Sequence, residues 1–129
     1  MKPSVEKTQI WVWAGKSAKT EHAPDNALNI ESGKWLIFRA ADQIDDAWTT
    51  IAEACGSGRL GQAKVSTRHP VHSGYRNKHV ICVYTDDSEN KPDVFRIREV
   101  LRDLGFTETL NYKPDAMTLQ KKKGSTWRA

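Results

Sequence analysis

Apolar residues along the chain follow two patterns. Some form short continuous or alternating runs, typical of β-strands, and others recur every three or four residues, as on one face of a helix. The strand-type clusters are rich in β-branched and aromatic residues and are bounded by Gly, Pro, Asn, Asp or Ser. They predict strands at 8–15, 33–40, 63–67, 79–85 and 109–116. In 33–40 and 79–85 both faces of the strand are apolar, so we expect these two in the middle of a sheet.

The first helix-type stripe begins after Asp42, a residue suited to a helix N-cap. Its members are Ile44, Trp48, Ile51 and Cys55. Their spacing places them on one face of a helix, which we expect to be buried. Gly56 and Gly58 are expected to end the helix.

The second stripe predicts a helix from Pro92 to about Leu104, because proline suits the first turn of a helix. Its apolar members are Val94, Ile97, Leu101 and Leu104. The charged positions, expected to stay in water, are Arg96, Arg98, Glu99, Arg102 and Asp103. Gly105 stands where a glycine commonly ends a helix.

The order of elements is strand, strand, helix, strand, strand, helix, strand, in one domain spanning 1–129 with a core at about 8–119 and a basic tail at 120–129. Short strands joined by a loop favour antiparallel pairing over the alternative of a parallel, doubly wound sheet. We therefore predict an α+β fold with a mostly antiparallel sheet and its helices on one face. The polar segment 16–33 is predicted to be a long loop, a candidate lid.

Composition indicates a soluble protein, with 38% apolar and 28% charged residues among 129. We find neither a signal peptide nor an apolar run near the roughly 18 residues of a membrane span, so we expect no membrane partner. Cys55 and Cys82 lack metal-type spacing and are expected to be buried thiols in the reducing cytoplasm. Common nucleotide and hydrolase motifs are absent, and no cofactor is predicted.

The formal net charge is +4, and it is unevenly spread. The stretch 59–79 contains Arg59, Lys64, Arg68, Arg76 and Lys78, together with His69, His72 and His79, and no acidic residue. Cations converging near exposed amides form an anion site, whereas the same residues scattered on a hairpin loop are ordinary surface charges. Lys64 favours the first interpretation, because it lies inside a strand and not at a loop tip.

The histidines allow more than one role. His69 and His72 are three residues apart in a loop without a third ligand, so no metal site is predicted. His79 begins a central strand, where an imidazole serves either as a general acid or base or as a hydrogen-bonded core residue.

The chain has five tryptophans, a high number for its length. Trp35 and Trp48 are predicted core residues. Trp11 and Trp13 lie on one face of the first strand because side chains alternate along a strand. These two and Trp127 are candidates either for stacking on nucleic-acid bases or for packing.

Four motifs together resemble a family whose animal member is called basophilic-leukemia-expressed protein and whose bacterial members are often labelled phosphothreonine lyase domain proteins. The motifs run from about Ser32 to Leu119 and read "SGKWLIF", "IDDAWTTIAEACGSGRLGQAKVST", "HVICVYTDDSENKPDVFRIREVLRDLGF" and "LNYKPDAMTL". The resemblance implies a fold like that of the eukaryotic cap-binding translation initiation factor, a curved sheet with a ligand cleft on its concave face.

This resemblance implies two possible activities. In cap-binding proteins two tryptophans sandwich a methylated base, a role for which Trp11, Trp13 and Trp127 are the candidates here. In a phosphothreonine lyase a lysine removes the α-proton and a histidine assists the leaving phosphate. Lys64 would then be the base and His79 the acid, with a phosphate clamp formed by Arg68, Arg76, Lys78 and Lys113, and with His69 or His72 as substitutes for the acid.

Our leading hypothesis from the sequence is a small basic module that binds a phosphorylated ligand, a nucleotide or a nucleic-acid end, in a concave sheet cleft. The predicted ligand-binding residues are Lys64, Arg68, His69, His72, Arg76, Lys78, Lys113, Trp11 and Trp13. The alternatives are a lyase-like enzyme and a protein–protein adaptor that uses an acidic helix face. The oligomeric state is left open.

Overall fold

The protein was analysed as a computed structural model that describes residues 2–15, 32–75, 77–116 and 127–129. The strands are β1 (Trp11–Gly15), β2 (Gly33–Ala40), β3 (Gln62–Ser66), β4 (Lys78–Thr85), β5 (Asn111–Pro114) and β6 (Trp127–Arg128). The helices are α2 (Ile44–Gly56), α3 (Lys91–Asp103) and a 3₁₀ turn, η1 (Pro70–Tyr75). Of the predicted candidate lid, 16–33, residues 16–31 lie outside the described residues, and Gly33 is the first residue of β2.

The described strands form one sheet in the order β1-β3-β4-β2-β5-β6, and each neighbouring pair is antiparallel. β2 and β4 lie in the middle and pair from Gly33↔Thr85 to Ala40↔Lys78. This confirms the predicted α+β fold and the two central strands. The physical reason is that a strand with apolar side chains on both faces buries more of them in the middle of a sheet, between two neighbouring strands, than at its edge.

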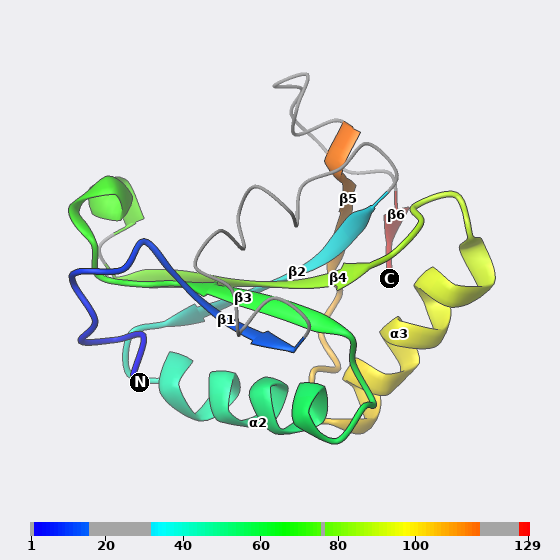
Figure 1. The fold of residues 1–129 in the computed structure, drawn as a ribbon, viewed down its shortest axis with the longest axis horizontal. Helices are drawn as coiled ribbons and strands as arrows, with labels where there is room; N and C mark the ends of the chain where they lie inside the picture. The colour runs from blue at the N-terminus through cyan, green and yellow to red at the C-terminus, as the bar shows by residue number, and fades with distance from the viewer. Residues whose placement is uncertain (1, 16–31, 76, 117–126) are drawn as a thin grey trace.

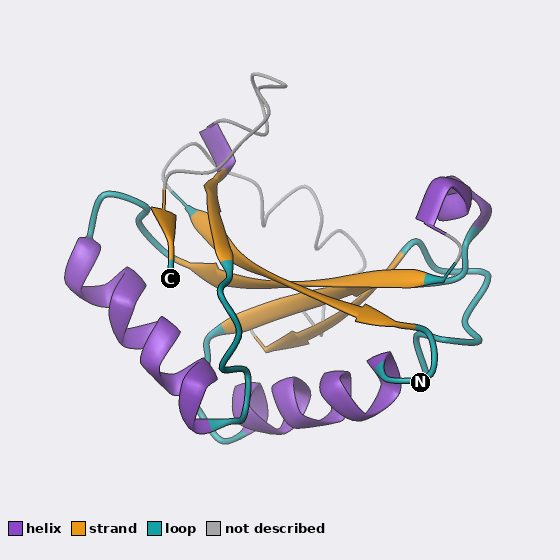
Figure 2. Cartoon of the chain, turned by 180° about the vertical axis from the view of Figure 1, so that it is seen from behind, coloured by secondary structure: helices purple, strands orange, loops and turns teal. Residues whose placement is uncertain are grey.

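Both long helices lie on one side of the sheet (Figures 1 and 2). The predicted stripe of α2, which comprises Ile44, Trp48, Ile51 and Cys55, is buried against the sheet. The prediction that Asp42 caps α2 was wrong. The N-cap is Gln43, without a side-chain hydrogen bond, and the first turn carries Asp45 and Asp46, whose charge suits a helix N-terminus.

α3 begins as expected, with Pro92 in its first turn and with Asn90 as N-cap, whose side chain accepts a hydrogen bond from the Asp93 amide. Gly105 follows the helix with a φ of 104°, a conformation that favours glycine. Val94, Ile97 and Leu101 are buried.

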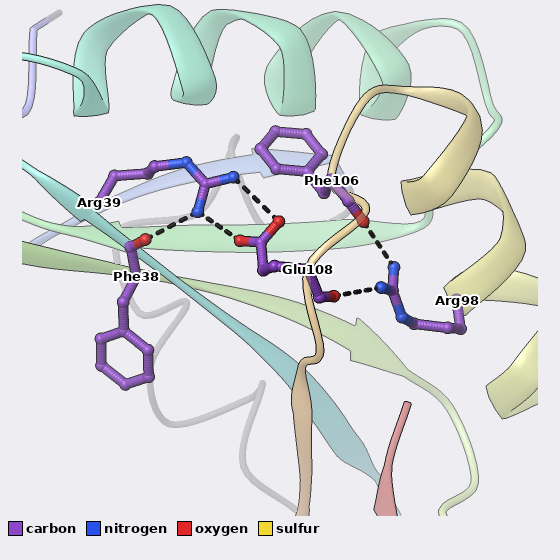
Figure 3. Close-up of polar contacts among 5 residues, drawn as sticks. All are labelled: Phe38, Arg39, Arg98, Phe106 and Glu108. Atoms are coloured by element: carbon purple, nitrogen blue, oxygen red, sulfur yellow. Dashed lines mark hydrogen bonds and ion pairs between the residues drawn. The ribbon is translucent and has the colours of Figure 1, made fainter.

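The prediction that Arg98 stays in water was wrong, because its side chain is fully buried. Its guanidinium donates hydrogen bonds to the carbonyls of Phe106, Glu108 and Ala129, over 2.9, 2.6 and 2.9 Å. Figure 3 shows the first two of these bonds, beside the ion pair between Arg39 and Glu108. A buried charge is tolerated when its donors are satisfied in this way.

The end of the chain belongs to the sheet. The backbones of Leu110 and Ala129 exchange two hydrogen bonds, and Trp127 packs against Phe95 and Tyr112 with ring centroids 5.5 Å apart in both contacts. Trp127 is therefore a packing residue on the helix side. In the part of the chain described, no helix has the length and apolar character needed to cross a membrane.

Candidate functional site

The face of the sheet opposite the helices carries a cavity of about 430 Å³. Strand alternation places the even-numbered side chains of β2, β3 and β4 on this face. Lysines from four strands line the cavity: Lys34 on β2, Lys64 on β3, Lys78 on β4 and Lys113 on β5. Much of the remaining lining is apolar and includes Trp11, Phe38 and Cys82. The cavity therefore combines positive charge with apolar and aromatic surface.

Lys64 lies at the centre of this arrangement and is only 9% exposed. Its Nζ lies over the Trp11 ring at 3.9 Å and over the Trp13 ring at 5.3 Å from the centroids. Among the described residues it forms no ion pair with an acid. Burial lowers the pKa of the Lys64 amine below its usual value, and the nearby Lys34 lowers it further. Lys64 is thus a desolvated cation that lies over two indole rings, with the charge of Asp115 partly offsetting the effect of its burial.

Lys34 has a different environment, although it is equally buried at 7% exposure. Its ammonium donates to the Asp115 carboxylate over 2.6 Å. The Ser32 hydroxyl donates to the other oxygen of the same carboxylate. The register pairs Lys34 with Lys113 on β5, so two lysines lie side by side at this end of the cavity.

Two aromatic residues border the Lys64 position from β1 and β4. Trp13 and Tyr84 stack with ring centroids 5.9 Å apart and an interplanar angle of 16°. Burial raises the pKa of Tyr84, and within the described residues its buried hydroxyl has no hydrogen-bond partner. Such an orphaned polar group is rare in native interiors.

Of the ligand-binding residues predicted in the loop after β3, some line the cavity and others do not. His72 lines it, donates a hydrogen bond from Nε2 to the Ile10 carbonyl over 2.8 Å, and meets the Trp11 ring edge-on. Arg68 is exposed and does not line the cavity. His69 accepts a hydrogen bond from the Val71 amide within the loop. Arg76 lies outside the described residues.

His79 is 2% exposed, and its Nδ1 contacts the Ser66 carbonyl at 2.8 Å. It also contributes to the cavity wall, as does the exposed Lys78, which lies over the Phe38 ring at 5.7 Å. The structure thus makes His79 a hydrogen-bonded core residue at the cavity edge.

Both cysteines are free and buried, as predicted from their apolar surroundings. Burial raises the pKa of the Cys82 thiol on the cavity floor, which keeps it protonated. Within the described residues, no cluster of three or more His, Cys, Asp or Glu side chains has the arrangement of a metal site.

Sequence reasoning missed Lys34, Tyr84 and Asp115. One signal was available for Lys34, since it is a lone charge at an alternate position of the otherwise apolar run "GKWLIF". Nothing in the sequence linked Asp115 to Lys34, because the two residues are 81 positions apart.

Solved structures of the translation factor eIF4E share the fold. The C. elegans eIF4E-3 in complex with the 4E-binding protein Mextli matches with a TM-score of 0.61 and 18% identity, over 79% of this chain and 60% of that one. A schistosome eIF4E complexed with m7GpppA and 4E-BP matches with a TM-score of 0.59 and 17% identity, over 79% of this chain and 61% of that one. The Ascaris suum eIF4E-3 with m7G cap matches with a TM-score of 0.51 and 21% identity, over 67% of this chain and 52% of that one. The chain thus spans about three fifths or less of these proteins.

The predicted likeness to the cap-binding initiation factor is thereby confirmed for the fold. At the level of sequence, a family model described as "Basophilic leukemia-expressed protein Bles03" matches residues 18–120. This match covers most of the sheet, both long helices and the lysines of the cavity. The chain belongs to the Bles03 family.

Proposed function

We propose that the chain binds a phosphorylated ligand, a nucleotide or the end of a nucleic acid, in the cavity on the open face of the sheet. The observation that carries this proposal is the convergence of Lys34, Lys64, Lys78 and Lys113 from four strands on one cavity. Charges of one sign on a shared apolar surface repel one another and lose hydration. Such a cluster is stabilised when an anion binds to it.

The charge balance favours a phosphate over a single carboxylate. Of the four lysines, Lys34 is paired with Asp115, while Lys64 faces the cavity without an acidic partner among the described residues. A phosphate has several acceptor oxygens and a larger negative charge, and lysine binds it as a point charge. It can therefore contact more than one ammonium at once.

The apolar part of the cavity favours a ligand with a ring system attached to its phosphate. A volume of about 430 Å³ lies within the usual range of small-molecule sites. Phe38 is 43% exposed at the cavity, and Trp11 is half-buried beside it, so both offer aromatic surface. The solved eIF4E structures that share this fold include complexes with m7G cap and m7GpppA, which supports a nucleotide as the class of ligand.

A binding titration tests this function. Labelled RNA with a 5′-phosphate, GTP and guanosine are titrated at low and at moderate salt. We expect the phosphorylated ligands to bind and their affinity to fall steeply with salt, because phosphate contacts release counterions. Guanosine, which has no phosphate, should bind far more weakly.

Lysine substitutions localise the site. Lys113→Met and Lys78→Met should each weaken GTP binding by about tenfold, the value of one charge-assisted contact. The matched control is Lys91→Met, because Lys91 is also exposed near an aromatic ring, at 5.9 Å from the Phe95 centroid, but lies at the start of α3. If no phosphorylated ligand binds even at low salt, the proposed function is wrong.

A lyase-like activity is the second candidate, because Lys64 and His79 line the same cavity and the pKa of Lys64 is lowered. In this reaction the neutral Lys64 amine takes the α-proton of phosphothreonine. The Cβ–O bond breaks, a Cα–Cβ double bond forms, and phosphate leaves after protonation by His79. Incubation with a phosphothreonine peptide tests it by mass spectrometry, where loss of phosphoric acid supports the lyase and an unchanged peptide excludes it.

A further inference from the structure

We propose that Lys64 determines the specificity of the cavity, so that it selects phosphorylated ligands whose attached ring is uncharged and disfavours a cationic, N7-methylated base. This inference rests on the function proposed above. It names the class of ligand more narrowly, as a nucleotide or an RNA 5′ end whose base carries no positive charge.

The argument begins with the faces of the aromatic rings. An indole attracts a cation to its face because the ring quadrupole is negative there, and a methylated, positively charged ring is recognised by the same attraction. In this chain the protein's own ammonium already occupies that position. The Lys64 Nζ is 3.9 Å from the Trp11 centroid and 5.3 Å from that of Trp13, the two indoles that lie on the same face of β1.

The position of Lys64 is set by the sheet and not by a flexible loop. β3 lies between β1 and β4, and the register places Lys64 between Trp13 on one side and Cys82 on the other. The side chain is 9% exposed, so it has little room to leave the rings. The ammonium is therefore a built-in part of the aromatic site.

The indoles are also held by other rings. Trp13 stacks on Tyr84 at 5.9 Å, and Trp11 meets the His72 ring edge-on at 5.0 Å. To place a methylated base between Trp11 and Trp13, the chain would have to break these contacts and expel Lys64. If Lys64 instead stayed over the indoles, its ammonium would repel a positively charged base placed there.

An anion at Lys64 has the opposite effect. A phosphate near Nζ compensates the buried charge while the ammonium stays over the indoles, so both favourable interactions are kept. The ammonium groups of Lys78 and Lys113, which line the same cavity, are further donors for the phosphate oxygens. The site therefore supplies donors for phosphate and a repulsive charge for a cationic ring.

The test compares the affinities of the protein for GTP and for N7-methyl-GTP, measured by calorimetry and by tryptophan fluorescence. The buffer is mildly acidic, so that the methylated base is cationic, and low in salt. We expect wild-type protein to bind N7-methyl-GTP no more tightly than GTP. In Lys64→Met the ratio of the two affinities should shift toward the methylated nucleotide by about tenfold or more. One cation–π position becomes vacant in this variant, and one repulsive charge is gone. Lys91→Met is the control, and its ratio should equal that of the wild type.

Three results are decisive against the inference. Wild-type protein that prefers N7-methyl-GTP by about tenfold or more overturns it while leaving the proposed function intact. A ratio that does not change in a folded Lys64→Met protein shows that Lys64 does not determine specificity. If neither nucleotide binds to wild-type protein, the proposed function fails and the inference fails with it. The wild-type comparison needs no variant, so it stands even if Lys64→Met does not fold.

Discussion

The Lys34 ammonium donates to the Asp115 carboxylate over 2.6 Å, across the 81 positions that separate the two residues in sequence. Lys64 lies on the same face of the sheet, is equally buried, and faces aromatic rings in place of an acid. The two buried lysines thus have separate uses. Lys34 holds the end of β5 to β2, and Lys64 presents its charge to the cavity.

We expect Asp115→Asn to lower the free energy of unfolding by about 3 kcal/mol, because it leaves the Lys34 ammonium without this carboxylate in a buried place. Urea denaturation measures the change. The control is Asp103→Asn, which removes the exposed pair with Arg59 at 3.6 Å and should cost less than about 1 kcal/mol. Equal effects of the two substitutions would contradict the structural role of the Lys34–Asp115 pair.

Lys64→Met should raise the free energy of unfolding by about 1 kcal/mol while it weakens phosphate binding, because a poorly compensated buried charge is replaced by an apolar side chain. Thermal and urea unfolding without ligand measure the first effect. Lys91→Met, at an exposed position, should leave stability nearly unchanged. A strongly destabilised Lys64→Met protein would show that the cation–π contacts outweigh the cost of burial.

The affinity for phosphate should depend on pH through Lys64. Its pKa in the folded protein lies below the ordinary 10.5, so the amine loses its proton at a lower pH than a surface lysine does. Binding needs the charged form, and we expect GTP affinity to fall as the pH rises from neutral through the lowered pKa. Titrations in Lys64→Met should show a flatter profile, and an identical slope in both proteins would exclude Lys64 as the titrating group.

The lowered pKa of Lys64 also makes the free energy of unfolding depend on pH. Between the lowered pKa and 10.5 the unfolded chain binds the Lys64 proton and the folded protein does not. Stability without ligand should therefore rise with pH in this window relative to Lys64→Met, because the cost of burying the charge disappears when the amine becomes neutral. Urea unfolding of both proteins at neutral and alkaline pH provides the comparison.

Arg98→Met should destabilise the fold by about 3 kcal/mol or more, since three carbonyls at once lose the charged donor of a buried side chain. The affected carbonyls belong to Phe106, Glu108 and Ala129, so the C-terminal strand should also become accessible to proteolysis. Arg96→Met is the matched control, because Arg96 lies two residues earlier on α3 with its side chain 61% exposed. Equal stability of the two variants would contradict the role assigned to Arg98.

Gly33→Ala should be poorly tolerated, because a Cβ at this position would collide with the Tyr112 ring, whose hydroxyl shares a 2.6 Å hydrogen bond with Thr85. A loss of about 1–3 kcal/mol is typical of such overpacking in a core. Gly56→Ala, where an added Cβ meets no atom within 4 Å, is the control and should be neutral. Denaturation of both variants under one set of conditions compares them directly.

Local patterns in the sequence predicted the two central strands, the apolar stripes of α2 and α3, and the start of α3 at Pro92. These features depend on alternation and on helical spacing, which are properties of neighbouring residues. The same patterns also placed Trp11 and Trp13 on one face of β1, where both contact Lys64. The burial of Arg98 had a weak signal, because it lies four residues after Val94 on the helix.

Tertiary structure decided which of the many cations line the cavity. The pairing of β2 with β4 and β5, and of β3 with β4, brings Lys34, Lys64 and Lys113 to one cavity, and no spacing along the chain encodes that register. The tertiary structure also packs Trp127 against Phe95 and Tyr112, and it leaves Arg68 exposed to solvent outside the cavity. Sequence determined the elements because their periodicity is local. The site required the fold because each of its charges comes from a different strand.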